Sequence, residues 1–231
     1  MIKTRHIGIV LGALLLAGTA AAQRLEGVVG HPENELILLD PAKSAGGNYK
    51  LDPQHTSVVG RVMHGRLSFY TFRFDKVDGN YTYDPAKPEG TKVEVNIDPA
   101  SIDSNLPVFD KRLRGPDFLD AEKYNAIKFV ATEIKRSDMT HGTMTGSLSF
   151  HGVTKPITLN VTFNGGGPAG RRITMGYSAT AMLKMPDYGM DISAHNIGDS
   201  VALTIETEFI NQDVKTDVER VRQLQTRPRE P

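Results

Sequence analysis

The sequence of 231 residues contains no cysteine and no tryptophan. Without cysteine there can be no disulfide, no thiolate nucleophile, no cysteine-ligated zinc and no iron–sulfur cluster. An excess of charge of either sign is lacking too, since 27 Lys+Arg balance 27 Asp+Glu. A general nucleic-acid binder needs surplus cations to displace counterions from phosphates. The composition therefore excludes thiol chemistry and predicts no nucleic-acid partner.

An apolar run near the amino terminus is too short to cross a bilayer. Residues 7–18 are mostly apolar, follow Lys3 and Arg5, and precede three alanines that end at Ala22. A membrane-spanning helix needs about 20 apolar residues. A positive start, a short apolar run and a small-residue site are typical of a secretory signal. We expect a signal peptide over residues 1–22, cleaved after Ala22, and a periplasmic mature protein.

Short segments of alternating apolar and polar residues fill the chain from residue 49 to residue 210. Clear examples are residues 93–97, 157–163 and 201–209. A period of two gives a strand one buried face and one wet face, which is typical of antiparallel sheets. Residues 107–114 break the pattern, because they begin with a proline at a tolerated first-turn position and Gly115-Pro116 follows as a stop signal. We predict an all-β barrel or sandwich with one short helix.

The segments on either side of this region differ from it in composition. Residues 23–48 end in a run rich in glycine and asparagine, which predicts an extension or linker. Residues 211–231 are polar and charged, which predicts a C-terminal tail outside the core. The predicted organisation is thus signal peptide, extension, a barrel over residues 49–210, and tail.

Local motifs for catalysis or cofactor binding are weak. Residues 165–170 match G-x-G-x-x-G by letter, but strand-like residues follow instead of the helix that a dinucleotide site needs, so a hairpin turn is expected. The histidines show no paired metal-ligand spacing, and no G-x-S-x-G elbow places a nucleophile. We predict no resident cofactor, no metal site and no enzymatic activity.

Five segments carry recognisable motifs in a fixed order. They are 49–58 (YKLDPQHTSV), 101–104 (SIDS), 110–120 (DKRLRGPDFLD), 122–129 (EKYNAIKF) and 146–159 (GSLSFHGVTKPITL). The third is similar to D-x-x-L-R-x-x-D-F-x-D, and the last to G-x-L-x-x-H-G-V-T-K-P-V-T-L. Together they resemble the YceI family of periplasmic polyisoprenoid-binding proteins. Residues 105–109 are more apolar than the corresponding family run, which predicts a changed ligand or pocket mouth.

The resemblance implies a lipocalin-like, extended antiparallel β-barrel that carries a long isoprenoid lipid without catalysis. The ligand would be an isoprenoid quinone or a polyprenyl pyrophosphate, loaded during transient membrane contact. A barrel of about eight strands can hold one small ligand, and an isoprenoid tail requires a dry lining. The predicted lining residues are Val95, Ile97, Phe109, Ile127, Phe129, Leu148, Phe150, Leu159, Val161, Phe163, Met175, Tyr177, Met182, Leu203 and Ile205.

A polar head group at one end of the barrel would need hydrogen-bond donors. His55, Arg112 and Arg114 are candidates, because they lie in family-like segments near the expected helix. The arginines could instead pair with nearby aspartates on the surface, as exposed ion pairs commonly do.

Two other functions stay open at this point. The first is a hydrolase on a lipid-linked substrate that uses His55 with Asp110, because catalytic groups assemble from dispersed residues. The second is an interaction or stress protein whose barrel is packed solid. Fold alone does not choose between them.

Overall fold

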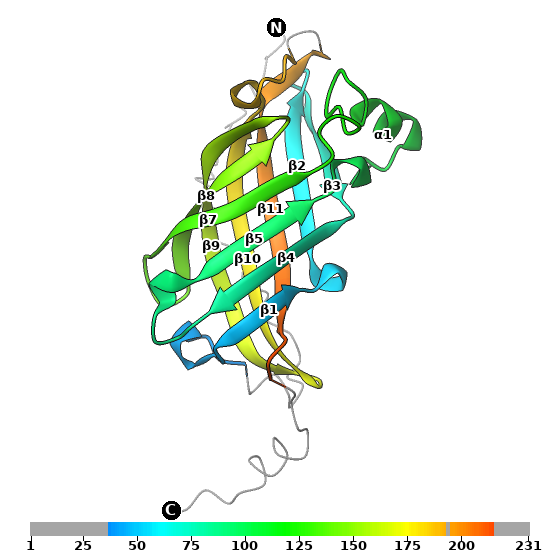
Figure 1. Ribbon diagram of the computed structural model, residues 1–231. Coiled ribbons are helices and arrows are strands. Elements are labelled where there is room, and N and C mark those ends of the chain that lie inside the picture. The colour runs from blue at the N-terminus through cyan, green and yellow to red at the C-terminus, as the bar shows by residue number, and fades with distance from the viewer. Residues whose placement is uncertain (1–36, 193–194, 215–231) are drawn as a thin grey trace, which may run out of the picture. The chain divides into compact units, whose positions relative to one another are not determined.

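The computed structural model (Figure 1) describes residues 37–192 and 195–214. The strands are β1 (Gly47–Leu51), β2 (Ser57–His64), β3 (Ser68–Phe74), β4 (Val77–Tyr83), β5 (Lys92–Ile97), β6 (Ile102–Asp103), β7 (Ile127–Arg136), β8 (His141–Phe150), β9 (Val153–Ala169), β10 (Arg172–Lys184) and β11 (Ile197–Asn211). One α-helix, α1 (Pro107–Leu113), and the short 3-10 turns η2 (Pro41–Lys43), η3 (Pro53–His55), η4 (Pro88–Gly90), η5 (Pro99–Ser101) and η6 (Met185–Tyr188) complete the described part. Among these residues no helix has the length and apolar character needed to cross a bilayer.

Eight strands close into a barrel. Their order is β1-β4-β5-β7-β8-β9-β10-β11, and β11 returns to pair with β1, so that Tyr49 lies opposite Asn211. All neighbouring pairs are antiparallel, and closure leaves these strands without a free edge. The predicted fold class, a lipocalin-like antiparallel barrel with one short helix, is confirmed.

Three further strands lengthen the barrel at one end. Strand β11 pairs with β2 through its first part and with β1 through its last part. The turn η3 separates β1 from β2, and Asp52 caps this turn by accepting a hydrogen bond from the Gln54 amide. Strand β3 pairs with β2, and the short strand β6 pairs with β3. Strands β2, β3 and β6 thus extend the sheet beyond β11, and β2 and β3 lie at the end of the barrel near α1 (Figure 1).

Helix α1 lies at this same end of the barrel (Figure 1). It spans seven residues, too few to be stable alone, so tertiary contacts must hold it. The buried Asp110 carboxylate accepts hydrogen bonds from the amide and the hydroxyl of Ser104. The Phe109 ring packs edge-on against Tyr70 of β3, with centroids 5.3 Å apart. These contacts tie the helix to β3 and to the residues after β6.

The glycine-rich run lies in a hairpin, but mostly in its first strand. Strand β9 extends to Ala169, and only Gly170 and Arg171 make the turn before β10. A Cβ atom on Gly166 would come within 2.6 Å of the Ser44 hydroxyl, so a side chain there would clash. Leu38 exchanges two backbone hydrogen bonds of 2.9 Å with Gly166. This close approach seats residues 38–44 against the barrel.

The predicted segments at the ends of the chain are described only in part. The signal peptide expected over residues 1–22 lies outside the described residues, as do most residues of the predicted tail. Within the predicted linker, Gly47 and Asn48 instead begin β1, where Gly47 pairs with Tyr83. Glycine is common in loops, but it also occurs in strands where another chain segment approaches closely. A Cβ atom on Gly47 would come within 2.7 Å of the Asp213 carboxylate.

Candidate functional site

The barrel encloses a cavity of about 830 Å³. This volume lies in the upper part of the range for small-molecule sites, about 300–1,000 Å³. The inward faces of β2 to β5 and of β7 to β11 contribute its wall, together with residues of α1. Aliphatic and aromatic side chains dominate the wall, so the interior suits an apolar ligand.

Most of the predicted lining residues lie on this wall. They are Val95, Ile97, Phe109, Ile127, Phe129, Leu148, Phe150, Leu159, Val161, Phe163, Tyr177, Leu203 and Ile205. Period-two alternation found them because each strand has one face toward the barrel axis. Their part in binding remains a prediction.

Met182 and Met175 are not on the wall, which corrects two predicted positions. On β10 the wall residues Tyr177, Ala179 and Leu183 alternate with outward residues, so Met182 points away and is 60% exposed. Met175 is fully buried, but it packs where the barrel is filled, with its Cγ 3.2 Å from the Cβ position of Gly166. The positions of the methionines in the sequence do not show which face of β10 each one is on; Ala179 is on the inward face and Met182 on the outward face.

Sequence reasoning also missed part of the wall. The residues not predicted include Leu51, Val58, Val62, Tyr70, Phe72, Phe74, Val77, Tyr81, Tyr83, Val93 and Ile157. Alternation in residues 70–74 was the available signal for β3, since Tyr70, Phe72 and Phe74 are separated by Thr71 and Arg73.

A pair of tyrosines forms a polar point inside the apolar cavity. The hydroxyl oxygens of Tyr81 and Tyr177 lie 2.9 Å apart, and their rings meet edge-on. Burial raises the pKa of both phenols far above the ordinary value of 10, so both stay neutral. Phe163 and Phe209 surround the pair with ring contacts. Neutral hydroxyls in this setting can hydrogen-bond each other or a ligand oxygen.

The cavity reaches the surface beside α1. Its wall there includes the exposed residues His64, Leu106 and Arg112. The Arg112 guanidinium lies 5.5 Å from the centroid of the Phe118 ring, and the His195 imidazole stacks on Phe118 at 4.5 Å. Arg112, a predicted head-group residue, therefore stands at an opening together with two imidazoles. A second opening lies by the β7–β8 turn, where Arg136 and Met139 belong to the wall and are exposed.

The other two predicted head-group residues stand elsewhere. Arg114 donates a hydrogen bond of 3.0 Å from Nη2 to the Ile102 carbonyl, so it holds α1 to β6. His55 lies on η3 with its Nδ1 at 2.9 Å from Asp52 Oδ2. Neither side chain is on the cavity wall. The two residues lie in different motif segments, so the resemblance to the family did not determine a common position around the opening. A role in head-group binding stays a prediction for both.

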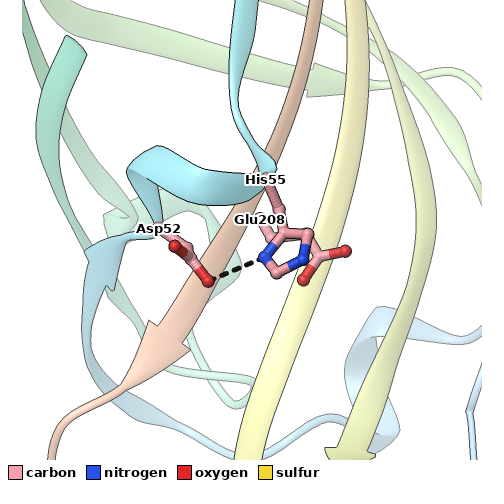
Figure 2. A group of neighbouring side chains, drawn as sticks. All are labelled: Asp52, His55 and Glu208. Carbon is pink, nitrogen blue, oxygen red and sulfur yellow. Dashed lines mark hydrogen bonds and ion pairs between the residues drawn. The ribbon is translucent and has the colours of Figure 1, made fainter. Parts of the chain in front are cut away.

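His55 lies between two carboxylates, those of Asp52 and Glu208 (Figure 2). One ligand atom of each residue lies within 4.8 Å of the others. The hydrogen bond with His55 lowers the pKa of Asp52, and the same bond, with Glu208 nearby, raises the pKa of His55. Asp52 already caps Gln54 with one carboxylate oxygen and contacts His55 with the other. We interpret the group as an ion pair of His55 with Asp52, with the Glu208 carboxylate nearby.

The residues of the hydrolase alternative have other partners. His55 pairs with Asp52, whereas Asp110 is buried against Ser104. A general base must reach the group whose proton it removes. The structure therefore does not bring His55 and Asp110 together as that alternative requires. Burial of Asp110 also removes it as a surface partner for Arg112 or Arg114.

The barrel is similar along its whole length to proteins of one family. The YceI-like domain matches residues 49–209. A UPF0312 protein of Pseudomonas putida (strain GB-1) is 40% identical over 158 residues, which cover 66% of this chain and 81% of that protein. The solved structure of a Campylobacter jejuni YceI protein is 26% identical, with a TM-score of 0.58 over 64% of this chain and 88% of that one. A polyisoprenoid binding domain from Saccharophagus degradans, 18% identical, shares the fold with a TM-score of 0.54 over 71% of this chain and 98% of its own.

Proposed function

The chain belongs to the YceI family, as its motifs predicted, and from this premise we propose that it is a periplasmic carrier of a long-chain isoprenoid lipid. The apolar cavity of about 830 Å³ carries the proposal. An isoprenoid tail has only apolar surface, and burial of each Å² in such a cavity contributes about 25 cal/mol. The Saccharophagus degradans domain of the same fold is described as polyisoprenoid binding, which agrees with this use.

The proposed ligand lies with its tail inside and its head at the opening beside α1. Arg112, His64 and His195 can donate hydrogen bonds there to a pyrophosphate or to quinone carbonyls. The Tyr81 and Tyr177 hydroxyls offer a second polar contact deeper in the barrel. The proposed role is binding and not catalysis, in keeping with the YceI family match and with the polyisoprenoid-binding domain that shares the fold.

The packed-barrel alternative is disfavoured by the cavity. A barrel that served only as a rigid support would fill its interior with side chains, as small barrels can. The described wall instead leaves a volume typical of ligand sites.

Ligand capture tests the proposal directly. Protein purified from a periplasmic fraction should show a stoichiometric adduct in native mass spectrometry, and solvent extraction should identify isoprene units. An apo mass that persists after incubation with isoprenoid quinones and polyprenyl phosphates would contradict the proposal.

A matched pair of variants on β10 places the ligand in the cavity. Ala179→Phe adds a ring on the wall and should abolish the adduct, because the added volume competes with the ligand. Thr180→Phe adds the same ring on the outer face and should leave the adduct unchanged. Equal adducts in both variants would exclude the barrel interior as the site.

A further inference from the structure

Exposed apolar side chains gather at the end of the barrel that carries α1. Leu67, on the β2–β3 turn, is 88% exposed, and Val108, on α1, is 82% exposed. These are the highest values among the large apolar side chains of the described residues. Phe69 and Leu106 are exposed beside them in sequence. Scattered apolar residues are ordinary on a surface, but a concentration of them marks an interaction site.

These residues flank one opening of the cavity. Leu106, before α1, and His64, at the end of β2, both belong to the cavity wall. The contact between Tyr70 and Phe109 joins β3 to α1 directly. Figure 1 shows α1 beside strands β2 and β3. We call Leu67, Phe69, Leu106 and Val108 the mouth rim.

Cations without acidic partners accompany the mouth rim. Arg66 is next to Leu67, and Lys111 is one turn after Val108; neither forms an ion pair within the described ranges 37–192 and 195–214. The Arg61 guanidinium lies over the Phe69 ring, 4.6 Å from its centroid. An acidic side chain, that of Asp117, is also exposed nearby in sequence, in the loop after α1. Apolar tips with adjacent free cations match a bilayer that contains anionic lipid.

We propose that the mouth rim docks on an anionic bilayer, with Arg66 and Lys111 against lipid phosphates, and presents the cavity opening to the membrane. The inference rests on the proposed function, because a ligand with a long apolar tail resides in the bilayer and must be exchanged there. Docking by the rim lets the tail pass from lipid to cavity without crossing water. At the second opening, by contrast, Met139 is the exposed apolar wall residue.

Vesicle flotation of the purified full chain tests the docking. Vesicles of phosphatidylglycerol with phosphatidylethanolamine should carry the protein upward, whereas pure phosphatidylcholine vesicles should carry much less. Leu67→Ser/Val108→Ser and, separately, Arg66→Glu/Lys111→Glu should each weaken partition at least about fivefold. Met182→Ser, an exposed methionine on the outer face of β10, and Lys87→Glu, near η4, are matched controls that should float like the wild type.

Four outcomes would overturn the inference. The wild-type chain could fail to float with anionic vesicles, or both rim variants could float as it does. If Met139→Ser lost flotation while the rim variants still floated, docking would belong to the other opening. A dimer in analytical ultracentrifugation that becomes a monomer in Leu67→Ser/Val108→Ser would assign the rim to a second copy of this chain.

A loading assay separates this inference from the proposed function. Leu67, Val108, Arg66 and Lys111 are not wall residues, so the rim variants should take up an isoprenoid quinone from detergent micelles like the wild type, as read by native mass. A wild type that loads but does not float contradicts the docking alone. A wild type that floats but does not load contradicts the proposed function and supports the docking surface.

Discussion

The Tyr81 and Tyr177 hydroxyls meet at 2.9 Å inside the barrel, although 96 residues separate them in the chain. Tyr81 lies on β4 and Tyr177 on β10, so the bond spans the barrel interior. Both phenols are otherwise surrounded by rings, those of Phe163, Phe209 and Tyr49 among them. The contact therefore couples two distant strands through one buried hydrogen bond.

Removal of either hydroxyl should destabilise the fold, but by a different amount for each tyrosine. Tyr177→Phe leaves the Tyr81 hydroxyl without its partner, whereas after Tyr81→Phe the Tyr177 hydroxyl still reaches the Met175 sulfur at 3.5 Å. An unpaired buried hydroxyl costs about 1–3 kcal/mol, so we expect the larger loss for Tyr177→Phe. Urea unfolding followed by circular dichroism measures both losses. In a double-mutant cycle, strictly additive effects would show that the two hydroxyls do not interact.

The same burial predicts an unusual alkaline titration. Of the seven tyrosines, Tyr81 and Tyr177 have a pKa raised far above 10 by burial, so their phenols should not ionise while the barrel is folded. Burial raises the pKa of Tyr49, Tyr83 and Tyr188 as well. Tyrosinate absorbance of the folded protein should therefore rise above pH 10, and a second step should follow only when the protein unfolds. Tyr81→Phe/Tyr177→Phe should reduce the second step. A single step completed in the folded protein would contradict the buried geometry.

Gly146 should not tolerate a methyl group. Its Cβ position lies 2.4 Å from the Phe129 ring, across β7 and β8, and Phe129 belongs to the cavity wall. Gly146→Ala must push this ring, so we expect a loss of stability of about 1–3 kcal/mol and weaker ligand retention. Gly90→Ala is the control, because no atom lies within 4 Å of its Cβ position. Equal unfolding midpoints for the two variants would refute the steric argument.

The Asp52–His55 pair should stabilise the fold in a bounded pH range. The raised pKa of His55 means that its contribution is complete below the ordinary value of 6.5 and is lost as pH rises through the folded-state pKa. The lowered pKa of Asp52 means that its contribution is complete above 3.8 and is lost as pH falls through its folded-state pKa. The stability difference between wild type and His55→Ala should thus be largest between these two values.

The size of this difference should be small, because the His55 side chain is exposed and solvent screens the pair. Exposed ion pairs contribute up to about 1 kcal/mol. Urea unfolding of both proteins across pH 3 to 9, with the His55 imidazole followed by NMR, measures it. A difference that does not change with pH would show that the pair contributes through packing alone.

The alternation of apolar residues by itself determined the strands of the barrel and much of the cavity wall. Val95, Phe129 and Leu203 lie on the cavity wall, because a period of two forces every second side chain onto one face. Their part in ligand binding stays a prediction. The helix over residues 107–114 was predicted within one residue, since proline favours its start and Gly115-Pro116 stops it. The family followed from motifs that keep their order along the chain.

Only the tertiary structure decided which faces meet and how much space they leave. Alternation assigns Met175 and Tyr177 to the same side of β10, but only closure of the barrel shows that one is packed and the other borders the cavity. The family-like segment that contains His55 predicted a position near α1, whereas the break at η3 turns His55 toward Asp52 and Glu208. Leu67 and Val108 lie 41 residues apart, and the packing of Tyr70 on Phe109 joins the segments that carry them. Local periodicity determines the face of each strand, while long-range pairing determines the neighbours.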